Sequence, residues 1–245
     1  MVAAVGFDLD GTLFDHAGAA RSAIVSFLSS RDWTHPGDPG AAWLELEDVH
    51  FREYAAGSIN FQEQRRRRMR GLLDSIDLES GAQDVDALFA DYLDHYRSAW
   101  LPYPDVTATL SELRSMGMVL AVLTNGEQDQ QEDKLRRMGV LDEFDAVLAA
   151  SALPAFKPDK LAFESLCSTL HLPASAVVYV GDDLAADAIG ARAAGLTPVW
   201  IDRHRRGGQP EDVPAMTSLT ELPGHIRALA RQLLGADPSV SFHRP

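Results

Sequence analysis

Short apolar segments alternate with helical patterns from about residue 104 onward, and this alternation constrains the fold more than any other feature. The segments are MVLAVL (118–123), AVLAA (146–150), AVVYV (176–180) and TPVWI (197–201). Strands that alternate with helices favour a parallel sheet covered on both faces. An apolar run at residues 2–7 is expected to add a first strand. The sequence therefore predicts an α/β, Rossmann-like core.

Residues 17–99 contain no strand-like run and interrupt this alternation. Apolar residues recur there at spacings of three and four, which indicates several amphipathic helices. We expect this block to be an inserted α-helical cap domain. The predicted catalytic core then comprises residues 1–16 and 100–235, and residues 236–245 are expected to form a loose tail.

Composition narrows the classes of partner. The net charge of −14 argues against non-specific binding to nucleic acid or to an anionic membrane. Cys167 is the one cysteine, so no disulfide forms within the chain, which suits a reducing cytosol. We find no signal-peptide pattern and no apolar run of the ~20 residues that span a bilayer. A cytoplasmic protein is therefore the expectation.

Polar residues follow the predicted strands at the points where the strands end. They are Asp8 and Asp10, then Thr124, Asn125 and Gly126, then Lys157, and finally Asp182, Asp183 and Asp187. In open α/β sheets, ligands bind at the carboxyl ends of the strands. An Asp–Gly turn or a helix cap would account for Asp10 and Asp15, but not for Asp8, which extends an apolar run. We therefore expect one polar site at this edge of the sheet.

The residue types in this group predict its chemistry. Converging carboxylates repel one another and need a cation, and oxygen ligands suit Mg²⁺. Lys157 is the positively charged side chain that we count among these residues. Thr124 offers a hydroxyl donor, and the Asn125–Gly126 turn offers backbone N–H groups to phosphate oxygens. The group therefore suits a small phosphorylated substrate.

The first two aspartates suit a divided catalytic task. Residues two apart on a strand face the same side, so the side chains of Asp8 and Asp10 are expected to lie close together. A carboxylate is a nucleophile toward phosphorus, so Asp8 can attack and form an acyl phosphate. Asp10 can protonate the leaving oxygen and then take a proton from water.

These motifs resemble the haloacid dehalogenase-like (HAD) hydrolase superfamily. The matching segments are DLDGTLFD (8–15), LTNG (123–126), FKPD (156–159) and VGDDLAAD (180–187). The resemblance implies a Rossmann-like core, a helical cap inserted between the first two motifs, and Mg²⁺ as the cofactor.

The resemblance also implies a role for each motif residue. Asp8 matches the nucleophile and a magnesium ligand, and Asp10 matches the acid/base, with its backbone carbonyl on the metal. Thr124 and Lys157 match the phosphate-binding pair, and Asp182 matches the remaining metal ligand. The phosphate-binding group further includes Gly11, Asn125 and Gly126, and the supporting groups are Asp183 and Asp187.

Branches of the superfamily differ in ways that the sequence addresses. Asp10 favours phosphoryl transfer, because true haloacid dehalogenases usually lack a second aspartate. Phosphonoacetaldehyde hydrolases use a cap lysine, whereas residues 17–99 contain none. The segments FQEQRRRRMR and LTNGEQDQQEDKL are similar to the branch of N-acylneuraminate-9-phosphatase and the pyrimidine nucleotidases. Arg65–Arg68 either bind a substrate anion or form a solvated helix face.

We expect a magnesium-dependent phosphatase that hydrolyses a sugar phosphate or a nucleoside monophosphate through a phosphoaspartate on Asp8. A sugar-phosphate mutase, which keeps the second aspartate, and a dehalogenase-type hydrolase are the enzymatic alternatives. A signalling module phosphorylated on aspartate is the alternative outside enzymes, although an inserted cap of about eighty residues argues against it.

Overall fold

The computed structural model describes residues 2–79 and 84–235. The predicted loose tail, residues 236–245, lies outside the described residues. The chain separates into two compact units, one formed by Met1–Phe14 with Pro102–Pro245 and the other by Asp15–Leu101. We call the first unit the core and the second unit the cap.

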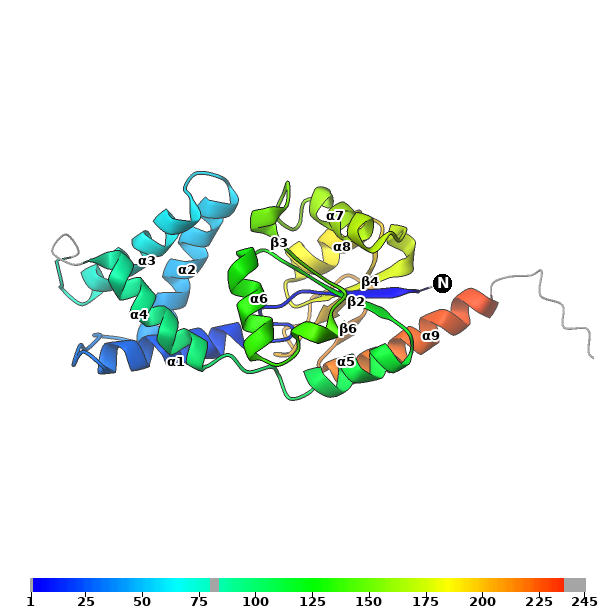
Figure 1. Cartoon of the computed structure of the whole chain (residues 1–245), viewed down its shortest axis with the longest axis horizontal. Coiled ribbons are helices and arrows are strands. Elements are labelled where there is room, and N and C mark those ends of the chain that lie inside the picture. The colour runs from blue at the N-terminus through cyan, green and yellow to red at the C-terminus, as the bar shows by residue number, and fades with distance from the viewer. Residues whose placement is uncertain (1, 80–83, 236–245) are drawn as a thin grey trace, which may run out of the picture. The chain divides into compact units, whose positions relative to one another are not determined.

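The core, shown in Figure 1, contains a parallel sheet. The strand order in this sheet is β3-β2-β1-β4-β5-β6. The strands are β1 Ala4–Phe7, β2 Val119–Thr124, β3 Ala146–Ala149, β4 Val177–Gly181, β5 Thr197–Ile201 and β6 Ala215–Met216. Each neighbouring pair in this order is parallel. The predicted α/β, Rossmann-like fold is confirmed. Strand β6 was not predicted, because two residues are too few to show the alternation of a strand.

The order of the strands in the sheet differs from their order in the chain at β1, which lies between β2 and β4. Phe7 is level with Val122 on one side and with Val180 on the other. The residues that follow β1, β2 and β4 therefore emerge at the same edge of the sheet. Open α/β sheets bind ligands at such a point.

Helices connect the strands and cover the sheet. The α-helices of the core are α5 Val106–Ser115, α6 Gln128–Arg137, α7 Lys160–Leu170, α8 Gly190–Ala193 and α9 Leu222–Gly235. The other helical segments are the π-helix η5 Leu184–Ile189 and the 3-10 turns η2 Leu141–Glu143, η3 Ala150–Ala152, η4 Ala174–Ala176 and η6 Leu219–Glu221. Among the described residues, no helix is long and apolar enough to cross a membrane.

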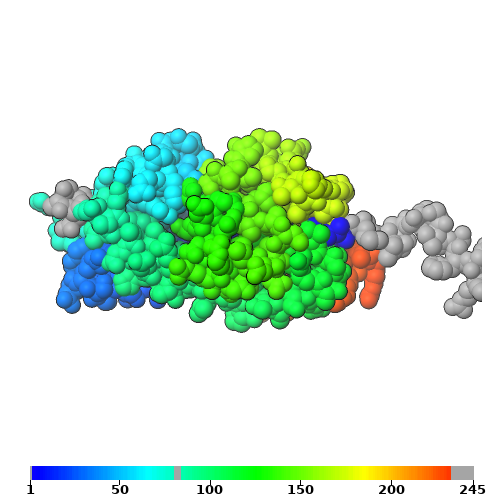
Figure 2. All heavy atoms as spheres, in the orientation of Figure 1, coloured from blue at the N-terminus to red at the C-terminus, as the bar shows by residue number. Residues whose placement is uncertain are grey.

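The central strand is enclosed by later segments of the chain. All four residues of β1 are buried, and little of the dark blue chain start is visible in Figure 2. On one face, Phe163 and Leu166 of α7 pack against Tyr179 of β4, and Cys167 packs against the same cluster. Burial of apolar surface contributes about 25 cal/mol per Å² to stability. This packing fixes the position of the residues that follow β1.

Helices form the described part of the cap. They are α1 His16–Ser29, α2 Pro39–Ala55, α3 Phe61–Ser75 and α4 Val85–Ser98. Each helix begins after an Asp or Asn whose side chain accepts a backbone N–H of the first turn, namely Asp15, Asp38, Asn60 and Asp84. Trp43, Phe89 and Tyr92 pack together between the helices, with the Trp43 and Tyr92 ring centroids 4.5 Å apart.

Candidate active site

A buried lysine binds two aspartates at the carboxyl edge of the sheet. Lys157 Nζ lies 2.6 Å from Oδ1 of Asp8 and 2.7 Å from Oδ1 of Asp187. It also donates to the Tyr179 hydroxyl at 3.0 Å. The exposed fractions are 6% for Asp8, 5% for Lys157 and 1% for Asp187. Buried charges are costly unless they are paired and hydrogen-bonded, so these groups stabilise one another in this arrangement.

Two neighbours determine where the lysine lies. The Asn125 side chain accepts a hydrogen bond from the Lys157 backbone N–H at 2.7 Å and donates to the Lys157 carbonyl at 2.9 Å. The Tyr179 hydroxyl donates to the Leu123 carbonyl at 2.7 Å, so its oxygen is free to accept from Lys157. The sequence assigns Asn125 only to phosphate binding. The structure adds a contact of its side chain with the lysine loop.

Three aspartates lie directly after β4 or in η5. Asp187 accepts a hydrogen bond from the Asp183 backbone N–H at 3.0 Å. The Asp183 carboxylate accepts from the first backbone N–H groups of η5 and caps that helix. The main-chain carbonyl of Asp182 accepts from Trp200 and Arg206, both at 2.9 Å. Asp183 and Asp187 therefore stabilise the turn that presents Asp182.

The carboxylates of this edge are crowded. Oxygens of Asp8, Asp182 and Asp187 lie within 4.8 Å of one another. Burial raises the pKa of Asp8 well above its usual value, against the influence of Lys157 and with that of the other two aspartates. Burial likewise raises the pKa of Asp182 to about 7, and Asp187 reinforces the shift. These carboxyl groups therefore hold a proton more tightly than usual, because burial and the neighbouring aspartates both disfavour the charged form.

This set of donors fits a hard divalent cation such as Mg²⁺, because the groups are all oxygens. Both oxygens of Asp187 already bind Lys157 or Asp183, so Asp8 and Asp182 are the better ligands. Gly11 provides the space for Asp182. Its φ is +88°, and a Cβ at this position would lie 2.4 Å from the Asp182 carboxyl carbon. A larger residue at position 11 would displace that carboxylate.

Asp10 is bound by two side chains of α6 that the sequence analysis did not select. Lys134 Nζ lies 2.5 Å from Oδ1 of Asp10, and Gln131 Nε2 donates to Oδ2 at 2.8 Å. The same Gln131 nitrogen donates to the Thr124 hydroxyl oxygen at 2.9 Å. Gln131 and Lys134 are each 1% exposed. Gln131 thereby joins Thr124, the residue that ends β2, to Asp10, a carboxylate that follows β1.

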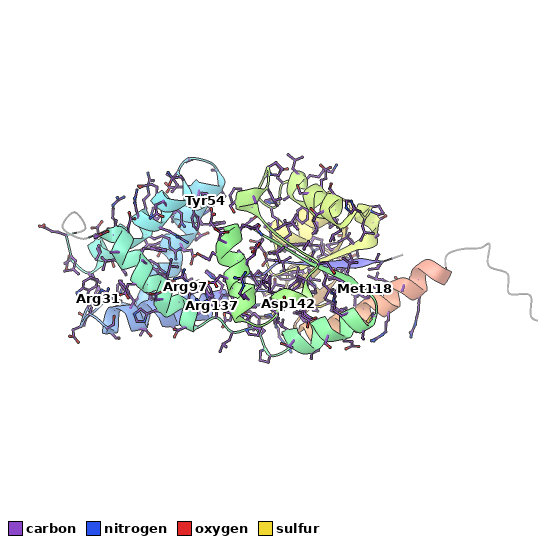
Figure 3. All side chains as sticks on the ribbon, in the orientation of Figure 1. Arg31, Tyr54, Arg97, Met118, Arg137 and Asp142 are labelled. Atoms are coloured by element: carbon purple, nitrogen blue, oxygen red, sulfur yellow. The ribbon has the colours of Figure 1, made fainter. Side chains whose placement is uncertain are left out.

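Helix α6 makes further contacts beside those with Asp10 and Thr124. Gln131 and Lys134 are three residues apart and therefore share one helix face. Arg137, labelled in Figure 3, lies at the end of α6 and binds Asp133 at 3.0 Å. The side chain of Gln128, the first residue of the helix, binds the backbone of β3 at 2.8 and 3.0 Å. The start of α6 is thus held on the sheet independently of Asp10.

The sequence predicts Lys157 as the positively charged side chain of the site, and the structure corrects this prediction by adding Lys134. Lys134 adds another buried ammonium group next to Asp10. Composition contained a signal for it, because the chain has 19 arginines and only three lysines, Lys134, Lys157 and Lys160. Two of these three lysines lie in the site. Where arginine is the usual cation of a chain, a lysine is a candidate for a special position.

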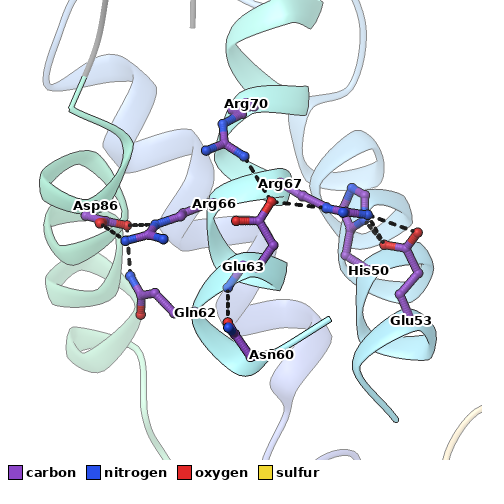
Figure 4. Close-up of polar contacts among 9 residues, drawn as sticks. All are labelled: His50, Glu53, Asn60, Gln62, Glu63, Arg66, Arg67, Arg70 and Asp86. Carbon is purple, nitrogen blue, oxygen red and sulfur yellow. Dashed lines mark hydrogen bonds and ion pairs between the residues drawn. The ribbon is translucent and has the colours of Figure 1, made fainter. Parts of the chain in front are cut away.

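The arginine run of the cap binds carboxylates of the cap itself (Figure 4). Arg66 binds Asp86 of α4 at 2.6 and 2.8 Å, and Arg67 binds Glu53 of α2 at 3.1 Å. These pairs link α3 to both neighbouring helices. Arg66 and Arg67 therefore have a structural function within the cap, and Arg68 is 6% exposed, so the run is a solvated helix face only in part. Binding of a substrate anion by Arg65–Arg68 stays a prediction.

The Rossmann-like core and its acidic, lysine-containing edge agree with the class of hydrolases that the motifs predict. The chain belongs to the haloacid dehalogenase-like hydrolases, whose family model matches residues 2–195. Proteins of this family that resemble the chain are enzymes, both phosphatases and dehalogenases.

Three relatives illustrate this range. The (S)-2-haloacid dehalogenase of Pseudomonas sp. (strain YL) is 30% identical over 229 residues, which cover 89% of this chain and 93% of the relative. The phosphoserine phosphatase of Thermus thermophilus is 35% identical over 175 residues, which cover 71% and 68%. The structure of the HAD hydrolase YfnB from Bacillus subtilis, solved with bound magnesium, matches with a TM-score of 0.80 at 21% identity and covers 92% of this chain and 99% of its own. The last likeness concerns the fold.

Proposed function

We propose that this protein is a magnesium-dependent phosphatase that hydrolyses a small phosphomonoester through a phosphoaspartate on Asp8. The observation that carries the proposal is the position of Asp10, whose carboxylate shares the Gln131 amide with the Thr124 hydroxyl. An alkoxide is a poor leaving group and needs a proton, which a second carboxyl group can supply. A halide leaves without a proton, so a dehalogenase has no comparable use for Asp10.

In the first half of the reaction, an oxygen of Asp8 forms a bond to phosphorus while the bond from phosphorus to the alcohol oxygen breaks. The departing oxygen takes the proton of the Asp10 carboxyl group. The Thr124 hydroxyl and the Lys157 ammonium bind phosphoryl oxygens, assisted by the turn at Asn125. Lys157 also favours the ionised form of Asp8 that attacks. The products are the alcohol, an acyl phosphate on Asp8 and an Asp10 carboxylate.

In the second half, the Asp10 carboxylate takes a proton from a water molecule, and the water oxygen bonds to phosphorus. The bond between phosphorus and the Asp8 oxygen breaks. Inorganic phosphate leaves, the Asp8 carboxylate is restored, and Asp10 is again protonated. One residue thus acts as acid and then as base.

The carboxylates of Asp8 and Asp182, together with the backbone carbonyl of Asp10, would hold Mg²⁺. A bound cation supplies positive charge that offsets the phosphate dianion and the crowded carboxylates. Asp183 and Asp187 support this group through the hydrogen bonds described above. The convergence of oxygens of Asp8, Asp182 and Asp187 within 4.8 Å of one another supports a cation in this position.

A second candidate is a dehalogenase, in which Asp8 displaces halide from carbon and water then hydrolyses the resulting ester. The observation in its favour is the 30% identity to an (S)-2-haloacid dehalogenase over 93% of that protein. This reaction needs the nucleophile and Lys157, but neither Asp10 nor Mg²⁺. The two candidates therefore differ in their dependence on metal and on residue 10.

The experiment that separates them measures phosphate release from sugar phosphates, nucleoside monophosphates and p-nitrophenyl phosphate, and halide release from 2-haloacids, with Mg²⁺ and with EDTA. A phosphatase releases phosphate only with the metal, and Asp8→Asn and Asp10→Asn each abolish release. Release of halide in EDTA that survives Asp10→Asn would establish the dehalogenase instead. Phosphate that stays on Asp8 without turnover would identify a mutase or a signalling module.

A further inference from the structure

Gln131 and Lys134 bind both oxygens of the Asp10 carboxylate. Asp10 follows the end of β1 by three residues, and its side chain is 30% exposed. Hydrogen bonds to both oxygens restrict the rotamers that such a side chain can adopt. Lys134 binds one oxygen and Gln131 the other, at 2.5 and 2.8 Å. We infer that Gln131 and Lys134 are positioning residues, which hold Asp10 and Thr124 in one arrangement for both halves of the reaction. This inference rests on the proposed phosphatase function.

The single amide nitrogen of Gln131 sets the relation between two functional groups. An amide NH₂ has two donor hydrogens, and here one points to Asp10 and the other to Thr124. Because the Thr124 oxygen accepts from Gln131, its own hydrogen remains available to donate to a phosphoryl oxygen. Gln131 thus orients the donor that binds phosphate and the carboxyl group that protonates the leaving oxygen.

The backbone leaves space for this amide. A Cβ at Gly126 would lie 2.4 Å from Gln131 Nε2, far inside contact distance. The sequence assigns Gly126 to the phosphate-binding turn. The structure shows that a glycine at this position also leaves space for the Gln131 side chain. A residue with a side chain at position 126 would clash with the Gln131 amide in its present position.

Lys134 binds the segment after β1 at two places. Its ammonium group pairs with Asp10 and lies 4.8 Å from the centre of the Phe14 ring. Both contacts favour a cation, and burial strengthens them. A lysine presents a compact charge on a flexible stem, whereas the guanidinium of arginine is larger and planar. This difference accounts for lysine at position 134 in a chain that otherwise uses arginine.

The test compares wild-type protein with Lys134→Met and Gln131→Met. The matched controls are Gln128→Met, which removes a side-chain amide of α6 that binds only β3 and its own helix, and Lys160→Met, which removes an exposed lysine. Two substrates are used with Mg²⁺, an alkyl phosphate and p-nitrophenyl phosphate. Rapid mixing measures the first burst of p-nitrophenolate, steady-state rates give kcat and KM, and mass spectrometry after acid quench measures phosphorylated Asp8. Thermal unfolding confirms that each variant is folded.

We expect Lys134→Met to lower kcat about 10²-fold with either substrate, because a misplaced group loses about that factor. The burst of p-nitrophenolate should persist, since this leaving group needs no proton, and phosphorylated Asp8 should accumulate because its hydrolysis still requires Asp10. With the alkyl phosphate, formation of phosphorylated Asp8 should itself be slow. Gln131→Met should in addition raise KM, because Thr124 loses the donor that orients it.

The controls should retain the wild-type pattern even where they lower the melting temperature. Folded Lys134→Met and Gln131→Met proteins with wild-type kinetics would overturn the inference. It would also be overturned if the burst of p-nitrophenolate and the steady-state rate slowed equally and phosphorylated Asp8 did not accumulate. Those results would leave the phosphatase assignment intact. A wild-type protein that releases no phosphate would instead overturn the proposed function, and this inference with it.

Discussion

The side chain of Asn125 binds the backbone of Lys157 through two hydrogen bonds of opposite direction, one from the Lys157 N–H at 2.7 Å and one to its carbonyl at 2.9 Å. Asn125 directly follows β2, whereas Lys157 lies in the loop before α7, 32 positions later. The Asn125 side chain therefore fixes the loop that contains Lys157 relative to the end of β2. The lysine that binds Asp8 is positioned by this contact as well as by its own ion pairs.

This relationship predicts that Asn125→Ala impairs catalysis although Lys157 is retained. Loss of both hydrogen bonds leaves the loop free to shift, and a displacement of about 1 Å can cost about 10²-fold in rate. We expect kcat to fall by about that factor, with a smaller loss than in Lys157→Met. The measurement is steady-state phosphate release with the best substrate. An Asn125→Ala protein with the full wild-type rate would show that the loop keeps its place without the amide.

The crowded carboxylates predict how stability depends on pH in metal-free protein. The pKa of Asp182 is about 7 in the folded state, compared with an ordinary value of 3.8. The folded state thus binds the proton more tightly, so this contribution to stability is present below about pH 4 and is lost as the pH rises through about 7. Asp8 shifts in the same direction. In EDTA, we expect the melting temperature to fall between pH 5 and pH 8.

Magnesium should counteract this loss, because the cation replaces the protons that the carboxylates release. Thermal unfolding with and without Mg²⁺ should show a larger stabilisation at pH 8 than at pH 5. Asp182→Asn is the matched variant. It should raise the melting temperature at pH 8 in EDTA and abolish most of the Mg²⁺ effect. An Mg²⁺ effect of equal size at both pH values, or one that survives Asp182→Asn, would place the cation elsewhere.

Two arginines of α3 differ in burial, so replacing each by alanine should lower the free energy of unfolding by different amounts. Arg68 is 6% exposed, binds Glu47 at 3.0 Å and lies 4.5 Å from the centre of the Trp43 ring. Its loss removes one of the two printed partners of Glu47, which keeps its contact with His16 at 3.0 Å, and also removes packing on Trp43, so Arg68→Ala should lower the free energy of unfolding by about 2 kcal/mol. Arg66 is an exposed partner of Asp86, and Arg66→Ala should cost less than about 1 kcal/mol. Urea unfolding of both variants measures the difference, and equal losses would contradict the structure.

The three lysines predict a simple pattern of chemical labelling. The side chain of Lys160 is 62% exposed, whereas the side chains of Lys134 and Lys157 are 1% and 3% exposed. An amine-reactive reagent should modify Lys160 in folded protein and leave the other two unmodified, while all three should react after denaturation. Peptide mass spectrometry reads the result. Modification of Lys134 at the rate of Lys160 would show that its environment is open to solvent.

Sequence patterns were sufficient for the class of fold. The run at 2–7 and the four later apolar segments each correspond to a strand, with ends that differ by a few residues, and only the two-residue β6 was overlooked. The motif residues were recognisable because they stand at strand ends. Gln131 and Lys134 were not recognisable in this way, since their contacts with Asp10 cross 121 and 124 positions of the chain. Within α6 they look like ordinary polar residues of an amphipathic helix.

The sequence by itself therefore determined which motif residues follow the strands at this edge of the sheet, because the alternation of strands and helices decides where the chain emerges. The tertiary structure alone decided how those groups interact. The raised pKa of Asp182, the orientation of Asp10 and the pairing of Lys157 depend on burial and on distances of a few ångströms between segments far apart in the chain. Electrostatic interactions of this kind depend on separation and on the surrounding dielectric, and neither is encoded in local sequence.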